Sequence, residues 1–388
     1  MRSFFDHRYY KWNKIFLACL GEWPEQSLFM RCLMPFVVCA NVMSLVAVET
    51  LYVINVWPNL DVFLEWLPAF CVLIISCLQL LNCSFQHKKF IKILEHIYSD
   101  WQRFRITPHI KILHKYAARG CWLTKTYFRW MYSACLCYLT MPLVMPKLVE
   151  LFVPVNGSTG KIYLFYAEYG VNSDDHYLSI LAHMFIESWL SIISIISNDA
   201  LYFVFAEHAC ALFEIVGENL KRVCSNETIA EDSKGDINYM IICRSIDLHK
   251  EAIIGLIDSF YNVSLLAIFG ASLLALSVTG LQVLMHLNEP GELVRFVSFA
   301  IAQIFHLYLN SVPGQKIMDH SLSIFNYAYS VDWHNLTPKA QKLLILIMIR
   351  SLRPCQITAG KIYIVTMENY SAIMQTSMSF FTVLSSMR

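Results

Sequence analysis

Seven separate stretches of this sequence are mainly apolar and are each long enough, as a helix, to cross a membrane. A helix needs roughly 20 such residues to span the hydrocarbon core of a bilayer. The stretches are 33–56, 62–83, 128–146, 178–206, 263–285, 293–312 and 362–386. We therefore predict an all-α membrane protein with seven transmembrane helices.

The composition agrees with a surface that faces lipid. Of the 388 residues, 56% are hydrophobic and only 15% are charged, whereas a soluble domain has roughly 25% charged residues. The net charge of +1 provides no basic field for nucleic acid. We expect a partner of another kind, the lipid bilayer itself.

The positions of lysine and arginine predict the orientation. Of the 30 basic residues, 26 lie before the first stretch or in alternate connections, which places those segments in the cytosol. The exceptions are Lys147, Lys161, Arg295 and Arg388. We predict a cytosolic N-terminus and an extracellular C-terminus. A G-protein-coupled receptor has the opposite orientation.

The chain is predicted to form one domain, 1–388. It consists of a cytosolic N-terminus (1–32), six spans (33–312), an inner segment (313–361) and a last span (362–388). Inner segments such as 90–98, 207–223 and 237–257 carry apolar residues at helical spacing. These cytosolic helical extensions either pack on one another or form a platform between subunits, and the sequence leaves both interpretations open.

Two features bear on the outer side and on covalent chemistry. Asn156-Gly-Ser lies in the one sizeable outer connection and is a candidate glycosylation site. None of the 13 cysteines falls in a segment predicted to lie outside, so we expect free thiols.

We find no metal-ligand set, phosphate loop or nucleophile elbow, and therefore expect no metal, no cofactor and no enzyme activity.

Ionisable residues interrupt several of the apolar stretches. They are Glu49, Glu65, His183, Glu187 and Asp199. Such groups are costly in lipid, so each is expected either to form a hydrogen bond between helices or to face a cavity.

The last stretch carries a row of polar residues on one helical face. The row is Glu368, Ser371, Gln375, Ser379, Thr382 and Ser386. A polar face on a transmembrane helix needs either water or a close neighbouring helix, so it indicates a pore or bundle packing. Val383 and Met387 lie one turn apart beside the row, and apolar side chains that narrow a wet path can gate it by dewetting.

Several motifs in the last third of the chain resemble the insect odorant receptor family. They are Tyr327-Ala-Tyr329, Asp332-Trp333, the segment Leu343–Ser351, Arg353-Pro354, the segment Ile357–Lys361 and the terminal segment Ser377–Leu384. The early segment Phe16–Pro24 resembles the N-terminal segment of the same family. The middle of the chain agrees only in span count, length and orientation.

This resemblance implies a subunit of a ligand-gated, non-selective cation channel. Such subunits assemble as tetramers with an obligate co-receptor of the same fold, in the plasma membrane of olfactory sensory neurons. It implies that the last span lines the pore, with a gate at Val383, Ser386 and Met387, and that segment 313–361 helps to anchor the subunits. The chain lacks the co-receptor's long insertion between spans four and five, and so resembles a tuning subunit.

The resemblance also implies a pocket for volatile molecules in the outer half of the bundle. An apolar cavity with aromatic walls is the physical requirement. The candidate residues at that depth are Trp66, Phe70, Tyr138, Met141, Met184, Phe185, Ser188 and Phe296. The alternatives are a gustatory-type receptor channel and a G-protein-linked chemoreceptor.

Overall fold

The computed structural model describes residues 4–152, 163–223, 238–246 and 253–386, most of which are helical. In chain order the elements are α1 (Lys11–Cys19), α2 (Leu28–Val56), α3 (Leu60–Phe85), α4 (His87–Phe104), α5 (Ile110–Phe152), α6 (Tyr177–Arg222), α8 (Ile253–Met285), α9 (Pro290–Tyr329), η1 (Trp333–Asn335), α10 (Pro338–Ser351), β1 (Thr358–Ala359), β2 (Tyr363–Ile364) and α11 (Met367–Ser386). All seven predicted stretches fall largely within helices, namely α2, α3, α5, α6, α8, α9 and α11.

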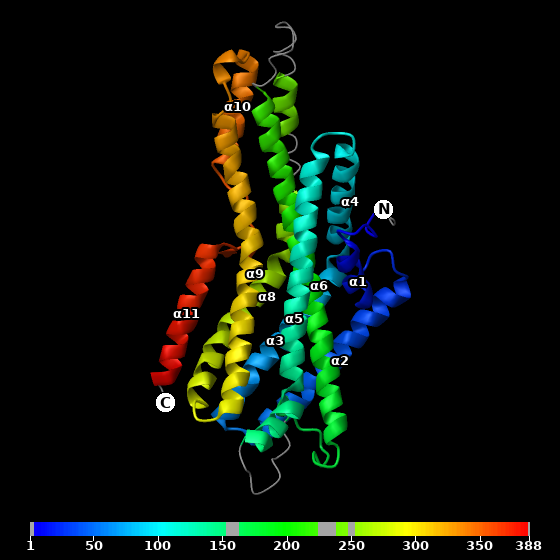
Figure 1. The fold of residues 1–388 in the computed structure, drawn as a ribbon, viewed down its shortest axis with the longest axis vertical. Helices are drawn as coiled ribbons and strands as arrows, with labels where there is room; N and C mark the ends of the chain where they lie inside the picture. The colour runs from blue at the N-terminus through cyan, green and yellow to red at the C-terminus, as the bar shows by residue number, and fades with distance from the viewer. Residues whose placement is uncertain (1–3, 153–162, 224–237, 247–252, 387–388) are drawn as a thin grey trace.

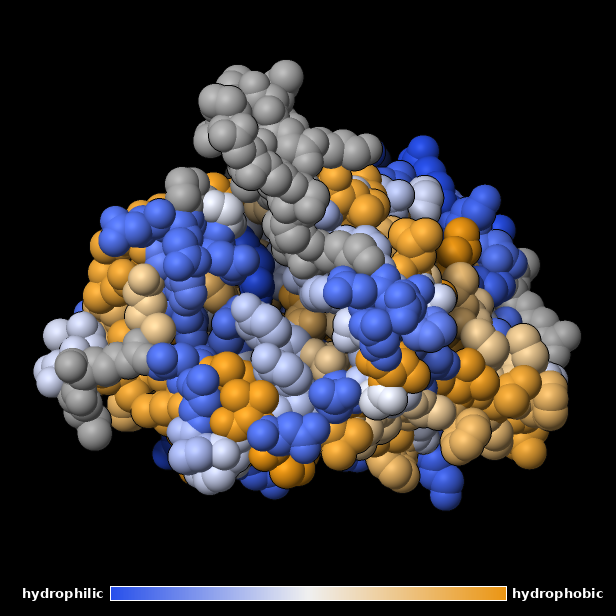
Figure 2. Space-filling view, turned by 90° about the horizontal axis from the view of Figure 1, so that it is seen from below, coloured by the Kyte–Doolittle hydropathy of each residue, from blue (hydrophilic) through white to orange (hydrophobic). Residues whose placement is uncertain are grey.

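The apolar helices form one bundle (Figure 1). Within the described residues, five helices are long and apolar enough to cross a membrane: α2, α3, α6, α8 and α9. Seen from below, many hydrophobic residues lie along the rim of the bundle, and hydrophilic residues are gathered over its end (Figure 2). This distribution suits a bundle surrounded by lipid, with its end in water.

Three helices are much longer than a membrane requires. Helices α5, α6 and α9 have 43, 46 and 40 residues, and they continue into the upper half of the molecule beside α4 and α10 (Figure 1). Helix α6 lies at the centre, where buried Glu207 pairs with Lys316 and His208 lies 2.9 Å from Asp100. Two of the predicted inner segments, 90–98 and 207–223, thus belong to helices α4 and α6, which contact each other within one chain.

The predicted start of the last span at residue 362 is wrong. Residues 358–359 and 363–364 form an antiparallel two-stranded hairpin, and α11 begins only at Met367. Gly360 and Lys361 both have left-handed φ values, of 63° and 58°, which helices do not accommodate. The apolar residues 362–365 are indistinguishable by composition from the first turn of a membrane helix, and this caused the error.

The hairpin fixes α11 to the two helices before it. The amide of Thr358 donates to Asp258 of α8 at 2.6 Å, and Asn262 of α8 donates to the Thr358 hydroxyl at 2.8 Å. On α9, a Cβ at Gly314 would overlap the carbonyl of Val365. Glycine at this position therefore lets the hairpin lie directly against α9.

Candidate functional site

A cavity of about 400 Å³ lies among α3, α5, α6, α8 and α9. Each of these helices turns small side chains toward the same space, and this leaves room that larger residues would fill. The small lining residues include Ala69, Ala134, Ser188, Ser191, Ala271, Ser272, Ala275 and Ala302. The volume is in the range that accommodates a small organic molecule.

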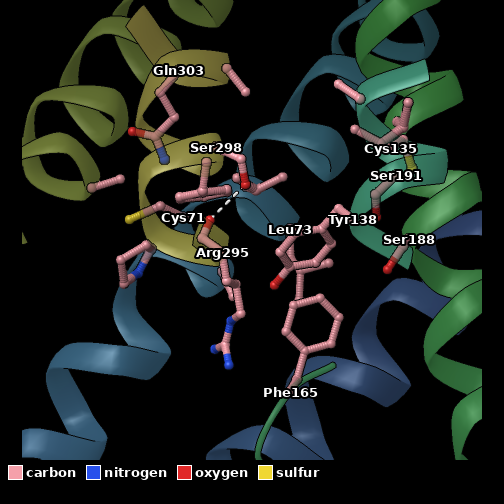
Figure 3. Close-up of a pocket in the computed structure, with 18 of the residues that line it drawn as sticks. Cys71, Leu73, Cys135, Tyr138, Phe165, Ser188, Ser191, Arg295, Ser298 and Gln303 are labelled. Atoms are coloured by element: carbon pink, nitrogen blue, oxygen red, sulfur yellow. Dashed lines mark hydrogen bonds between the residues drawn. The ribbon is translucent and has the colours of Figure 1, made fainter. Parts of the chain in front are cut away.

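Aromatic side chains form much of the remaining wall. They are Trp66, Tyr138, Phe165, Tyr166, Phe296 and Phe299. Figure 3 shows Tyr138 and Phe165 side by side in the cavity, and their ring centroids lie 6.2 Å apart. Such walls bind apolar ligands by burial and dispersion.

The structure brings five of the eight predicted pocket residues to the cavity: Trp66, Tyr138, Met141, Ser188 and Phe296. The other three lie outside its lining and pack in the bundle. Phe70 stacks behind Trp66 with centroids 4.4 Å apart. Met184 is a buried core residue, and Phe185 packs beside Trp189.

Sequence reasoning missed several lining residues. Phe165 and Tyr166 come from the connection between α5 and α6, where the aromatic cluster 163–169 was the available signal. Arg295, Gln303 and His306 of α9 also line the cavity. Figure 3 places Arg295 and Gln303 on one side and Ser188 and Ser191 on the other.

Three residues of the cavity lining carry buried polar atoms without a hydrogen-bond partner. Among the described residues, the indole nitrogen of Trp66, the hydroxyl of Ser191 and Oε1 of Gln303 are buried and have no hydrogen-bond partner. A ligand with a hydrogen-bonding group could satisfy one of these atoms if the side chain that carries it turns toward the cavity. Unsatisfied polar atoms of this kind fix the orientation of a ligand that apolar walls hold.

Arg295 joins α9 to α3 at one side of the cavity. Its guanidinium donates to Glu65 and to Glu292, both at 2.8 Å. The side chains of Arg295 and Glu65 are 17% and 13% exposed, so the pair is largely removed from water. The predicted need of Glu65 for a partner is met by this ion pair.

Asp199 of α6 is the centre of a second polar group, next to the cavity. Its carboxyl accepts hydrogen bonds from Gln79 of α3 at 3.0 Å, from the Tyr127 hydroxyl of α5 and from Asn310 of α9 at 3.3 Å. His306, which lines the cavity, has Nε2 2.7 Å from the same carboxyl. Asp199 thus joins α6 to three neighbouring helices beside the cavity wall.

The remaining ionisable residues in the apolar stretches differ in their environments. His183 bonds Ser44 of α2 at 2.9 Å and Tyr169 of the connection between α5 and α6 at 2.8 Å. Glu49 and Glu187 are both buried, and among the described residues neither carboxyl has a hydrogen-bond partner. Of these two residues, Glu49 lines the cavity.

The polar row of α11 faces away from the chain's own bundle. All six of its residues are exposed, whereas Ile373 and Ser377 of the same helix are buried. Val383 is 54% exposed. The predicted gate residue Met387 and the glycosylation candidate Asn156 lie outside the described residues.

Comparison with known proteins identifies the family. A model of the 7tm odorant receptor family matches residues 59–378, which is most of the chain. The chain belongs to the 7tm odorant receptor family. It is therefore a multi-pass membrane receptor and not an enzyme, and the match favours an odorant receptor over a gustatory one.

Relatives of known identity agree with this assignment. The receptor is 20% identical to odorant receptor 13a of Drosophila melanogaster, over 96% of this chain and 94% of that one. It is 33% identical to odorant receptor 10 of Aedes albopictus over 23% of each chain.

A solved structure has a similar fold. The receptor resembles the insect olfactory receptor OR5 from Machilis hrabei in complex with eugenol, with a TM-score of 0.77 and 12% identity over 97% of both chains. The OR5 structure described without eugenol has a TM-score of 0.74 and 14% identity over 98% of both chains. At these identities the likeness shows a shared fold.

Proposed function

We propose that this receptor is an odorant-tuning subunit that binds a volatile molecule in the cavity and opens a non-selective cation channel together with a co-receptor of the same fold. In this proposal the receptor is located in the plasma membrane of olfactory sensory neurons. The similar OR5 structure in complex with eugenol is that of a receptor holding a small volatile compound. Family membership and the aromatic cavity support the same ligand class here.

The exposed polar row of α11 is the observation that carries the channel proposal. Serine, threonine, glutamine and glutamate side chains cannot face hydrocarbon without a cost. Within the chain, α11 turns Ile373 and Ser377 inward and leaves the row uncovered. If copies of the same helix from neighbouring subunits surrounded a water-filled path, the row would face water.

The predicted orientation fits such an assembly. The chain ends lie at different levels of the bundle: the C-terminus lies at its lower end, and the N-terminus lies near α1 and α4 (Figure 1). With the basic segments in the cytosol, the lower end of α11 is extracellular. Val383 and Ser386 then lie at the outer mouth of the path.

Two helices connect the cavity to α11. Helix α9 lines the cavity from Val294 to His306, and farther along it Gln315 accepts the Met367 amide at 3.1 Å. Helix α8 lines the cavity near Ser272 and meets Phe381 of α11 at Gly280. A ligand that prefers one packing of α8 and α9 would therefore shift the position of α11.

Co-expression of the receptor with a co-receptor tests this function. We expect volatile compounds to evoke a current that does not discriminate between sodium and potassium and is unchanged when G-protein activation is blocked. A response abolished by that block would favour a G-protein-linked receptor. An N-terminal epitope detected on intact cells would contradict the orientation on which the channel proposal depends.

Trp66 offers a test of the cavity as the odorant site. Trp66→Ala removes a large aromatic wall, so we expect the half-maximal odorant concentration to rise by about tenfold or more. The matched control is Phe36→Ala in α2, because Phe36 is 70% exposed on the outside of the bundle. Equal shifts in the two variants, measured as concentration–response curves, would place the binding site elsewhere.

A further inference from the structure

Glu49 is the residue through which α2 lines the cavity. It is 1% exposed, and among the described residues neither oxygen of its carboxyl has a hydrogen-bond partner. The other acidic residue of the lining, Glu65, is neutralised by Arg295 at 2.8 Å. Glu49 is therefore a buried acidic residue for which the described residues provide no hydrogen-bond partner.

Arg295 is not free to form an ion pair with Glu49, because it already pairs with two other carboxyl groups. Its guanidinium already donates to Glu65 and Glu292, each at 2.8 Å. Arg295 therefore neutralises Glu65 and Glu292, and among the described residues no guanidinium lies within hydrogen-bond range of the Glu49 carboxyl. An additional positive charge would be favourable there, and an additional negative charge would not.

Aromatic rings lie around the same part of the wall. Tyr138, Phe165 and Tyr166 line the cavity together with Glu49. Tyr166 also stacks on Tyr52, less than one turn along α2 from Glu49, with centroids 5.5 Å apart.

A carboxylate buried without a partner is unfavourable, whereas one paired with a cation in good geometry is not. Aromatic faces attract cations through their quadrupole, and the combination of a carboxylate with aromatic walls recognises ammonium groups. The neutral polar atoms of Trp66, Ser191 and Gln303 do not select for charge. Of the ionisable lining residues, Arg295 and Glu65 pair with each other and His306 contacts Asp199, so Glu49 is the group that gives the cavity a preference in ligand charge.

We propose that the cavity selects volatile amines, with the ammonium group paired to the Glu49 carboxylate and the apolar body held among the aromatic and small residues of α3, α5, α6 and α9. This proposal rests on the proposed function, because it assumes that odorants bind in the cavity. A carboxylic acid of the same shape would bring a second negative charge to Glu49 and is selected against.

The experiment uses pairs of volatiles that share a carbon skeleton and differ only in an amino or a hydroxyl group, such as phenethylamine and phenethyl alcohol. Each compound is applied to cells that express the receptor with a co-receptor, and the half-maximal concentration is measured. For the pairs that activate, we expect the amine to act at a concentration at least about tenfold lower than the alcohol.

The variant Glu49→Gln keeps the size of the side chain but removes its charge. We expect the ratio of alcohol to amine half-maximal concentrations to fall at least about tenfold in this variant, because the ammonium loses its counter-ion. The matched control is Glu187→Gln, since Glu187 is also buried and unpartnered among the described residues but does not line the cavity. This control should keep the wild-type ratio.

The possible outcomes separate the two proposals. If alcohols activate the receptor as strongly as amines, or if Glu49→Gln leaves the ratio unchanged, the selection of amines is wrong and odorant reception stands. A preference for alcohols that is lost in Glu49→Gln would instead mean that Glu49 acts as a neutral hydrogen-bonding group. If no compound evokes current from receptor that reaches the cell surface, the proposed function itself fails, and this inference fails with it.

Discussion

Replacement of Asp199 by alanine is expected to remove most of the folded receptor from the cell surface. The substitution leaves the donors of Gln79, Tyr127 and Asn310 buried without their acceptor, and His306 loses its contact. Breaking a buried charged network of this kind costs about 3–5 kcal/mol, against a total stability of about 5–15 kcal/mol for a typical protein. Surface biotinylation and a thermal melt of the detergent-solubilised receptor measure the effect.

Glu187→Gln is the matched control for Asp199→Ala. Glu187 lies in the same helix and is equally buried, but among the described residues its carboxyl has no hydrogen-bond partner. We expect this variant to reach the surface at the wild-type level. Equal loss in both variants would show that any change to a buried acid of α6 disrupts folding, and that the contacts of Asp199 are not the cause.

The second large effect is expected on ion flow. The double substitution Gln375→Leu and Ser379→Leu makes the centre of the exposed α11 row apolar, and an apolar constriction in a water-filled path excludes water. We expect the maximal odorant-evoked current to fall by more than about tenfold, since each kilocalorie added to a barrier reduces passage severalfold. Whole-cell current, normalised to the amount of receptor at the surface, measures this.

The control for the row is Phe380→Leu. Phe380 is 50% exposed on α11 but lies on a different face from Gln375 and Ser379. Current should be retained in this variant. If the double substitution also retains full current, α11 does not line the ion path, and the channel proposal loses its principal support.

The length and position of the helices could be predicted because membrane thickness fixes how many apolar residues a span needs. The predicted stretches 33–56 and 178–206, for example, lie within α2 and α6. The extension of α6 beyond the length of a membrane span was also predictable, because residues 207–223 keep a helical spacing of apolar residues. The hairpin before α11 was not, because residues 362–365 are as apolar as a membrane helix.

The cavity was predictable only in part. Aromatic residues at the right depth included Trp66 and Tyr138, which line it, and Phe70 and Phe185, which do not. Depth follows from the sequence position along a helix, but the direction of a side chain depends on how that helix is rotated against its neighbours. Phe165 lines the cavity from the connection between α5 and α6. The path of an irregular connection cannot be predicted from a periodic pattern of apolar residues.

The sequence by itself determined the all-α membrane fold, the helical segments and the polar row of α11, because these depend on composition and on spacing along a single helix. Only the tertiary structure decided that small residues from five helices leave a common space, that Asp199 gathers donors from three neighbouring helices, and that Glu49 lies in the cavity wall without a partner among the described residues. Each of these depends on residues far apart in the chain, whose proximity is set by the packing of whole helices.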